Sequence, residues 1–292
     1  MTCHTSPVIN AKTPSLGSIA LVGHPNVGKS ALFQCLTGLH VTISNYPGTT
    51  VEVSRGLARA LPETEFIDTP GIITFPPYSE DEQVTARFLL NEPVKAILQV
   101  GDAKNLRRTL LLTVQLIEMG LPMVLALNMT DEAASRGIMV DYQALSECLS
   151  ISVIPTTATR GLGITELNTA LANTSSSQLA LVYPPAIEDA VEKIIPNLSN
   201  PPLAARAMAL LFFCEDLVVE TWIKENYSTQ TVQKLSAIRL ALGESFIEPL
   251  AIVIQQARHD KAEQIVSQVV QDRGFDWRSL SAKLGRLTTH PG

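Results

Sequence analysis

The sequence is poor in cysteine, in aromatic residues and in positive charge. Its four cysteines, Cys3, Cys35, Cys148 and Cys214, lie far apart and form no C-x-x-C pair. This spacing argues against a disulfide framework or a zinc site and favours a reducing cytoplasm. Asp and Glu number 28 against 22 Lys and Arg, a net charge of -6, so no broad nucleic-acid-binding face is expected.

Long apolar runs are also missing. No stretch of about 18 uncharged apolar residues occurs, so the sequence predicts no membrane-spanning helix. Residues 1–17 lack the apolar core of a secretory signal, and with Pro7 and Pro14 they are expected to form a flexible tail. The 292 residues suffice for one large domain or two ordinary ones.

What the sequence does contain is the string Gly23-His24-Pro25-Asn26-Val27-Gly28-Lys29-Ser30, which matches the phosphate-binding pattern G-x-x-x-x-G-K-[ST]. An apolar run over 19–22 precedes it, and a helical stripe of apolar residues follows it over 32–39. This is the strand–loop–helix context that the pattern requires. Lys29 is predicted to bind the β- and γ-phosphates, and Ser30 to bind magnesium.

Two further motifs each follow a predicted strand. Asp68-x-x-Gly71 is expected to hold the magnesium through water, with the Gly71 N–H facing the γ-phosphate. Asn128-x-x-Asp131 places a carboxylate where it can accept hydrogen bonds from N1–H and the 2-amino group of guanine. Adenine has no such amino group, so this motif favours GTP over ATP.

Other positions complete the predicted nucleotide site. Thr50 is expected to sense the γ-phosphate and to join the magnesium shell only when GTP is bound. Thr156, Thr157 and Ala158 follow the next strand, where backbone N–H groups would meet guanine O6. The whole predicted GTP/GDP-binding set is Gly23, His24, Pro25, Asn26, Val27, Gly28, Lys29, Ser30, Ala31, Gly48, Thr49, Thr50, Asp68, Thr69, Pro70, Gly71, Asn128, Met129, Asp131, Thr156, Thr157 and Ala158.

The pattern of elements predicts an α/β fold followed by an all-α one. Strand and helix signals alternate over 18–173, which indicates a mostly parallel sheet of six or seven strands with helices on both faces. Residues 40–50 are interpreted as a mobile loop and 51–57 as an edge strand. The composition changes over 173–185, and residues 184–288 show helical stripes with no catalytic motif.

Taken in order, these motifs resemble those of the translation-factor-like GTPases. A finer resemblance, to the N-terminal cytosolic part of the bacterial ferrous iron transport protein B family (FeoB), depends on five segments. They are Asn45–Glu52, Tyr78-Ser79-x-x-Glu82, Val100-Gly101-Asp102-Ala103-x-Asn105-Leu106, Leu127–Ala133 and the terminal Thr289–Gly292. The resemblance covers nearly the whole chain past Gly17.

This resemblance implies a GTPase at the cytoplasmic face of the bacterial inner membrane, with Mg²⁺ as cofactor. A membrane permease would follow residue 292, and residues 184–288 would form a regulatory domain that slows GDP release. Small Feo accessory proteins and a second copy of the chain are further candidate partners, and nucleic acid is not. We expect no iron site in this chain, because no Cys, His and carboxylate cluster has metal-site spacing.

Two residues suggest how the reaction runs. Ile72 occupies the position where many GTPases carry a water-orienting Gln, so we expect slow intrinsic hydrolysis. In similar GTPases an Asn at the position of Asn26 binds potassium, which supplies the charge of an arginine finger. The predicted catalytic set is therefore Lys29, Thr50, Gly71 and Asn26. Met129 stands where other GTPases have Lys, and the His24 side chain is expected to point outward.

Two other classes compete with this interpretation. A ribosome- or RNA-associated GTPase usually appends a basic RNA-binding fold, and the helical half is not notably basic. An ATP-using kinase shares the phosphate-binding loop. RNA binding at moderate salt would favour the first class, and displacement of GDP by ATP would favour the second.

Overall fold

The computed structural model describes residues 17–38 and 41–272. The first 16 residues of the predicted tail and the terminal motif at 289–292 lie outside the described residues. So does the last helix that the stripes of 184–288 predict, over 276–287. Within the described ranges, no helix combines the length and the apolar character that crossing a membrane requires.

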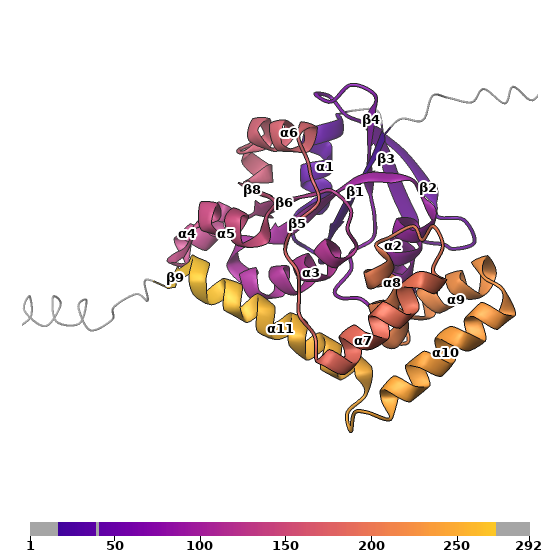
Figure 1. Ribbon diagram of the computed structural model, residues 1–292. Helices are drawn as coiled ribbons and strands as arrows, with labels where there is room; N and C mark the ends of the chain where they lie inside the picture. The colour runs from indigo at the N-terminus through magenta and orange to yellow at the C-terminus, as the bar shows by residue number, and fades with distance from the viewer. Residues whose placement is uncertain (1–16, 39–40, 273–292) are drawn as a thin grey trace, which may run out of the picture.

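A seven-stranded, mostly parallel sheet forms the centre of the first half, as predicted (Figure 1). Its spatial order is β2-β3-β4-β1-β5-β6-β8. The five strands from β4 to β8 run parallel, while β2 and β3 are antiparallel to their neighbours. The strands are β1 (Gly17–Gly23), β2 (Val41–Asn45), β3 (Glu52–Leu57), β4 (Thr64–Asp68), β5 (Val94–Asp102), β6 (Met123–Asn128) and β8 (Ser152–Pro155).

The predicted mobile loop over 40–50 is wrong in part, because Val41–Asn45 forms the edge strand β2. It pairs with β3 from Val41↔Gly56 to Asn45↔Glu52, so β3 is not the edge. Tyr46 N donates to Val51 O (2.8 Å) and Gly48 adopts φ 77°, which closes the hairpin. All five residues of β2 are exposed, and without a buried face the strand shows no hydrophobic alternation in the sequence.

Both faces of the sheet are covered by helices, as the apolar run in β1 predicts. Ile19 and Leu21 pack in one core with α1 (Lys29–Thr37) and α6 (Ile164–Ala172). Ala20 and Val22 belong to the opposite core, which includes α2 (Glu80–Asn91), α3 (Leu106–Glu118) and α5 (Tyr142–Leu149).

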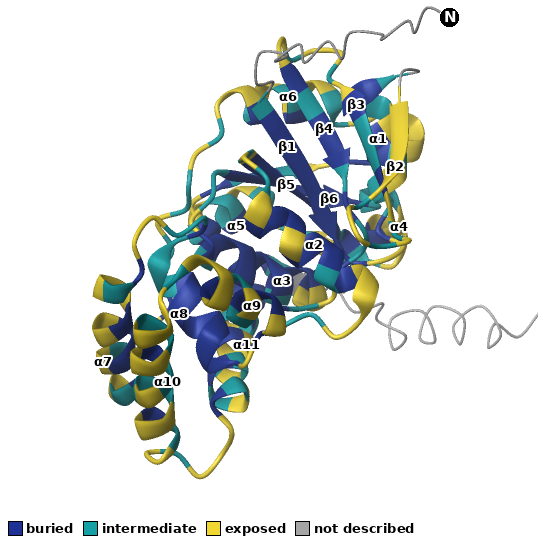
Figure 2. Cartoon of the chain, turned by 90° about the vertical axis from the view of Figure 1, so that its right-hand side faces the viewer, coloured by how far each residue is buried: buried dark blue, intermediate teal, exposed yellow. Residues whose placement is uncertain are grey.

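The second half is helical, and its core is continuous with the α2–α3 side of the sheet. It consists of α7 (Pro185–Ile194), α8 (Ala205–Phe213), α9 (Leu217–Asn226), α10 (Thr229–Gly243) and α11 (Leu250–Val269). In Figures 1 and 2 these helices lie below the sheet, and α11 runs back under α3. A two-stranded sheet, β7 (Ile138–Val140) with β9 (Val270–Asp272), joins the end of α11 to the first half.

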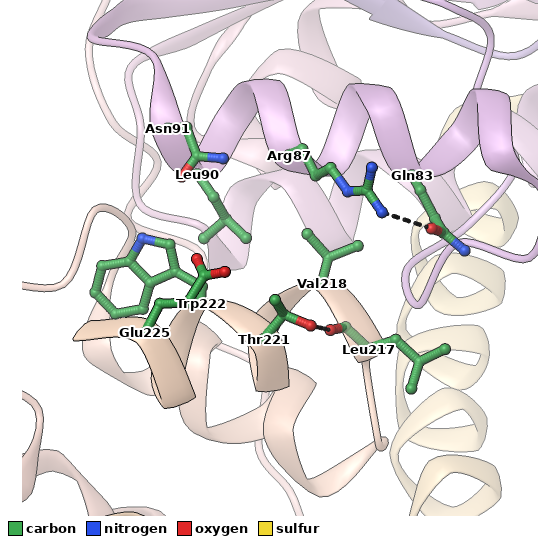
Figure 3. Close-up of a pocket in the computed structure, with 9 residues that line it drawn as sticks. All are labelled: Gln83, Arg87, Leu90, Asn91, Leu217, Val218, Thr221, Trp222 and Glu225. Carbon is green, nitrogen blue, oxygen red and sulfur yellow. Dashed lines mark hydrogen bonds between the residues drawn. The ribbon is translucent and has the colours of Figure 1, made fainter. Parts of the chain in front are cut away.

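Figure 3 shows where α9 meets α2. A groove between the two helices is lined from α2 by Gln83, Arg87, Leu90 and Asn91, and from α9 by Leu217, Val218, Thr221, Trp222 and Glu225. α2 directly follows the loop after Gly71. The groove therefore separates the helix attached to this loop, α2, from the helical half of the molecule.

Candidate functional site

The loop between β1 and α1 has the backbone geometry of an anion-binding turn. Asn26 and Gly28 adopt positive φ values of 64° and 86°. A Cβ on Gly28 would lie 2.3 Å from Nδ2 of Asn128, so only glycine fits there. α1 has no acidic residue in its first turn and no side-chain cap. Its first N–H groups and positive dipole end are therefore available to an anionic ligand.

Lys29, Ser30 and Asp68, three predicted phosphate and metal residues, form one cluster. β1 and β4 pair with Leu21 opposite Asp68, which brings the end of β4 beside the loop. Lys29 Nζ donates to Asp68 Oδ1 and to the carbonyl oxygen of Thr69, and Ser30 Oγ donates to Asp68 Oδ2 (2.9 Å). The side chains of Lys29 and Asp68 are only 12% and 11% exposed.

The Asp68–Gly71 turn is fastened to the phosphate-binding loop. Thr69 Oγ1 donates to Leu21 O (2.7 Å), and Ile72 N donates to Gly23 O (2.9 Å). A Cβ on Gly71 would lie 2.9 Å from the backbone nitrogen of Pro25. The absence of a side chain at Gly71 therefore permits the two loops to touch, as a shared phosphate site requires.

Asn128 connects the phosphate-binding loop to the loop after β8. Its Nδ2 donates to Val27 O (2.9 Å), while its Oδ1 accepts from Ala158 N (3.0 Å) and Thr156 Oγ1 (3.2 Å). The side chain is buried, at 3% exposed, and both of its polar atoms find hydrogen-bond partners inside the protein. Asn128 thus holds three predicted segments together.

Asp131 lies on the first turn of α4 (Thr130–Ser135). Its Oδ1 accepts from Glu132 N (3.0 Å), and its Oδ2 lies 3.6 Å from Nε of the exposed Arg160. Thr130 Oγ1 donates to Thr156 O (3.1 Å) and lies 3.0 Å from Thr157 Oγ1. The carboxylate predicted to select the base therefore stands beside the predicted 156–158 loop.

Thr50 does not join this cluster. It is exposed at the tip of the β2–β3 hairpin, and among the hydrogen bonds of residues 17–38 and 41–272 none connects it to Lys29, Ser30 or Asp68. Its neighbour Thr49 donates from Oγ1 to Tyr46 O (3.0 Å) and accepts from Val51 N (3.3 Å). The hairpin turn that these bonds close leaves Thr50 outside.

The outward orientation expected for His24 is wrong. The residue is 3% exposed and lines a cavity of about 230 Å³ with Asn26, Asp102 and Arg108. Burial, reinforced by the nearby positive charge of Arg108, lowers the pKa of His24 to about 4. A loop residue in a G-x-x-x-x-G-K-[ST] string carries no pattern that tells which way its side chain turns.

Glu82, part of the Tyr78-Ser79-x-x-Glu82 segment, lies three residues after Ser79, a spacing that predicts a capping box at the start of α2, and that box is present. Glu82 does more, because its carboxylate also accepts from Ile73 N (2.9 Å) and Tyr78 N (2.8 Å). It is 5% exposed. One buried carboxylate therefore fixes both ends of the 73–78 loop to α2, a role for which the only sequence signal is the S-x-x-E pattern.

Comparisons with known proteins identify the family of the chain. A family model described as ferrous iron transport protein B matches residues 17–171, and a model of the FeoB cytosolic helical domain matches residues 183–271. A fusion of Fe(2+) transport protein A and Fe(2+) transporter FeoB from Porphyromonas gingivalis is 34% identical, over 93% of this chain and 34% of that protein.

Solved structures of the same family resemble the chain. A GDP-bound mutant of NFeoB from S. thermophilus is 34% identical, with a TM-score of 0.78, over 87% of this chain and all (100%) of that one. NFeoB from S. thermophilus bound to GDP, AlF4⁻ and K⁺ is 33% identical, with a TM-score of 0.73, over 86% and 99%.

The chain spans 34% to 41% of the length of the curated relatives it matches first. Its mostly parallel sheet and phosphate-binding loop have the P-loop GTPase fold of these neighbours, followed by a helical domain. The chain belongs to the ferrous iron transport protein B family.

Proposed function

We propose that this chain binds GTP and GDP, hydrolyses GTP slowly and regulates the permease of a ferrous iron transporter at the cytoplasmic face of the bacterial inner membrane. The observation that carries the proposal is the cluster of Lys29, Ser30 and Asp68 at the open N-terminus of α1. Asn128 connects this cluster's loop to the predicted base site, so triphosphate and purine are recognised by one rigid unit.

Binding of a nucleotide changes the partner of Lys29. In this structure its ammonium binds Asp68 and the Thr69 carbonyl, at the position where phosphate oxygens would compete. A charge-assisted bond to phosphate replaces the bond to Asp68, which frees the Asp68 carboxylate. The phosphate groups thereby control the contacts of the Asp68–Gly71 turn, which leads to α2.

The residues fit a magnesium ion, because the Ser30 hydroxyl and the Asp68 carboxylate are hard oxygen donors that face each other across 2.9 Å. Ser30 would hold the ion directly, Asp68 through water, and Thr50 after the hairpin folds inward. When bound there, Mg²⁺ would supply positive charge that offsets the negative charge developing on the phosphates.

Hydrolysis is slow because Ile72, fully buried at 0% exposure, has no group that orients a water molecule. Asn26, with its left-handed backbone at φ 64°, would supply a side-chain oxygen to K⁺ beside the phosphates. The neighbour bound to GDP, AlF4⁻ and K⁺ supports a potassium ion as ligand in this family. Potassium would then provide the positive charge that an arginine finger provides in other GTPases.

The helical half, residues 184–288, would be the regulatory domain acting on GDP release, and residues 18–173 the GTP-binding domain. Contacts of α11 with α3 and of α9 with α2 support such a role, since α2 follows the Asp68–Gly71 turn in the chain and would shift with it. The permease part of a longer protein, small Feo accessory proteins and a second copy of the chain are the partners we propose.

Titration calorimetry of the purified chain with GDP, GTP and ATP tests the proposal. We expect heat from both guanine nucleotides and none from ATP, and Lys29→Ala should lose the GTP signal. GTP hydrolysis should be faster in potassium than in sodium, and Asn26→Ala should remove that difference. Absence of heat with GDP and GTP would refute nucleotide binding, and equal rates in the two salts would refute the role of Asn26.

A further inference from the structure

Lys104 lies beside the segment predicted to recognise the base, residues 128–132. β5 and β6 pair with Asp102 opposite Asn128, so the residues that follow the two strands are neighbours. Asp102 caps the short 3₁₀ helix η1 (Ala103–Asn105) by accepting from Lys104 N (2.9 Å) and from Asn105 Nδ2 (2.8 Å). This turn sends the Lys104 side chain across the end of β6.

The Lys104 ammonium is held at three points. Nζ lies 3.0 Å from Sδ of Met129, donates to Oε2 of Glu132 (2.8 Å) and lies 3.5 Å from Oδ1 of Asp102. The side chain is only 10% exposed. A long flexible side chain loses conformational freedom when it is fixed in this way, so the contacts must offset that cost.

These contacts enclose Asp131. Met129 has a left-handed backbone (φ 61°, ψ 36°), and α4 starts after it without a side-chain cap. A bulky residue keeps such a conformation only where its surroundings hold it. Lys104 touches the side chain two residues before Asp131 and the one directly after it, so it fixes both sides of the base-selecting carboxylate.

Met129 also extends this contact toward the phosphates. Its Cε would lie 3.8 Å from a Cβ at Gly28, and the Asn128 amide would lie closer still, at 2.3 Å. The Lys104–Met129 contact therefore presses residues of the base site against the phosphate-binding loop. An isolated Lys104–Glu132 pair, with Glu132 half exposed at 53%, would contribute little on its own.

We propose that Lys104 is a positioning residue for guanine recognition. Its ammonium holds Met129 and Glu132, and thereby directs the Asp131 carboxylate at N1–H and the 2-amino group of the purine. The inference depends on the guanine-nucleotide binding proposed above, and it adds a residue outside the recognised motifs to the determinants of base selection.

The test compares GDP with IDP, whose base lacks the 2-amino group that Asp131 would bind. In Lys104→Met, which keeps the stem and removes the charge, we expect fluorescently labelled GDP to dissociate about tenfold faster and the GDP-to-IDP affinity ratio to fall by a similar factor. Lys104→Arg should keep most of the ratio because it keeps the charge. Lys95→Met removes the same charge at the exposed start of β5 and should change neither quantity.

The ratio separates positioning from mere stability. If Lys104→Met released GDP at the wild-type rate, or weakened GDP and IDP equally, Lys104 would not direct Asp131. If Lys104→Met did not fold, Glu132→Gln would serve as the test. It weakens the Lys104–Glu132 contact that holds Asp131 on its exposed side, so it should also lower the GDP-to-IDP ratio. A wild-type ratio in Glu132→Gln would then overturn the inference. Failure of the wild-type chain to bind GDP would instead overturn the proposed function itself.

Discussion

Gln115 on α3 and Gln255 on α11 are joined by a hydrogen bond of 3.0 Å from Gln115 Nε2 to Gln255 Oε1, and both bind Phe75. Gln115 Oε1 accepts from Phe75 N (2.9 Å), and Gln255 Nε2 donates to Phe75 O (2.6 Å). The backbone N–H and C=O of Phe75, a residue of the loop after Gly71, are thus bound by side chains from the two halves of the molecule. A change in that loop reaches α11 directly.

Removing the contribution of α11 should loosen this loop. In Gln255→Ala we expect GDP to dissociate about three- to tenfold faster, which corresponds to the roughly 1 kcal/mol of one hydrogen-bond connection. Dissociation of fluorescently labelled GDP measures the effect. The matched control is Gln256→Ala, because Gln256 is exposed at the next position and its side chain binds Asp260 on its own helix. Equal rates in the two variants would show that α11 does not act on the loop.

Glu118 and Arg258 form a buried ion pair between α3 and α11. Arg258 Nε and Nη2 each lie 2.8 Å from Glu118 Oε2, and the side chains are 5% and 2% exposed. Tyr183 OH donates to Glu118 Oε1 (2.6 Å). Burial is the largest single influence and would lower the pKa of Arg258, but Glu118, Tyr183 and Cys214 together more than offset it, and the pKa is raised.

Breaking this pair should be costly. Glu118→Ala leaves the Arg258 charge buried and unpaired, so we expect the free energy of unfolding to fall by about 3–5 kcal/mol. The double variant Glu118→Met with Arg258→Met should be more stable than either single variant. Urea unfolding measures these values. Glu263→Ala breaks the exposed pair with Arg107 (3.2 Å) and should cost less than about 1 kcal/mol; a similar loss in both variants would contradict the argument.

His24 should make stability depend on pH. Its folded pKa of about 4 lies below the ordinary 6.5, so the unfolded chain binds the proton more tightly. Its contribution is therefore complete above about pH 6.5 and is lost as the pH falls toward 4, to the extent of about 3 kcal/mol. The midpoint of urea unfolding should shift accordingly. His24→Asn should flatten this dependence, whereas His259→Asn, at a half-exposed side chain, should leave it unchanged.

Trp222 offers a direct readout of movement at the α2–α9 groove (Figure 3). The chain has two tryptophans, so Trp277→Phe leaves the groove's indole as the only one. We expect its emission to differ between the GDP complex and a complex with a non-hydrolysable GTP analogue, because α2 follows the loop after Gly71. Asp68→Ala should abolish the difference. Identical spectra would mean that α2 does not shift against α9.

Much of the first half could be predicted because its signals are local. The phosphate-binding string, the apolar run over 19–22 and the Ser79–Glu82 capping box each determine a short element from neighbouring residues. Ile19 and Ala20 could be expected on opposite faces of the sheet because strand side chains alternate. The three motifs that follow strands could be expected at one edge of the sheet, because the carboxyl ends of parallel strands lie on the same side.

What could not be predicted depends on pairing across long distances. β2 is a strand only because β3 lies beside it, and its five exposed residues show no pattern. β7 and β9 have three residues each, and their paired residues are 130 to 134 positions apart in the chain. The positions of Gln115, Lys104 and Glu118 likewise follow from packing partners on other elements, which no local pattern indicates.

The short β7–β9 ladder has a mechanical consequence. It returns the end of α11 to a strand directly after α4, the helix whose first turn carries Asp131. Tension on the polypeptide beyond residue 272 would therefore act on the strand that follows α4, next to the predicted base site. A force on a downstream segment would then be transmitted to the predicted nucleotide site through the three residue pairs of this ladder, and a change at that site would be transmitted back.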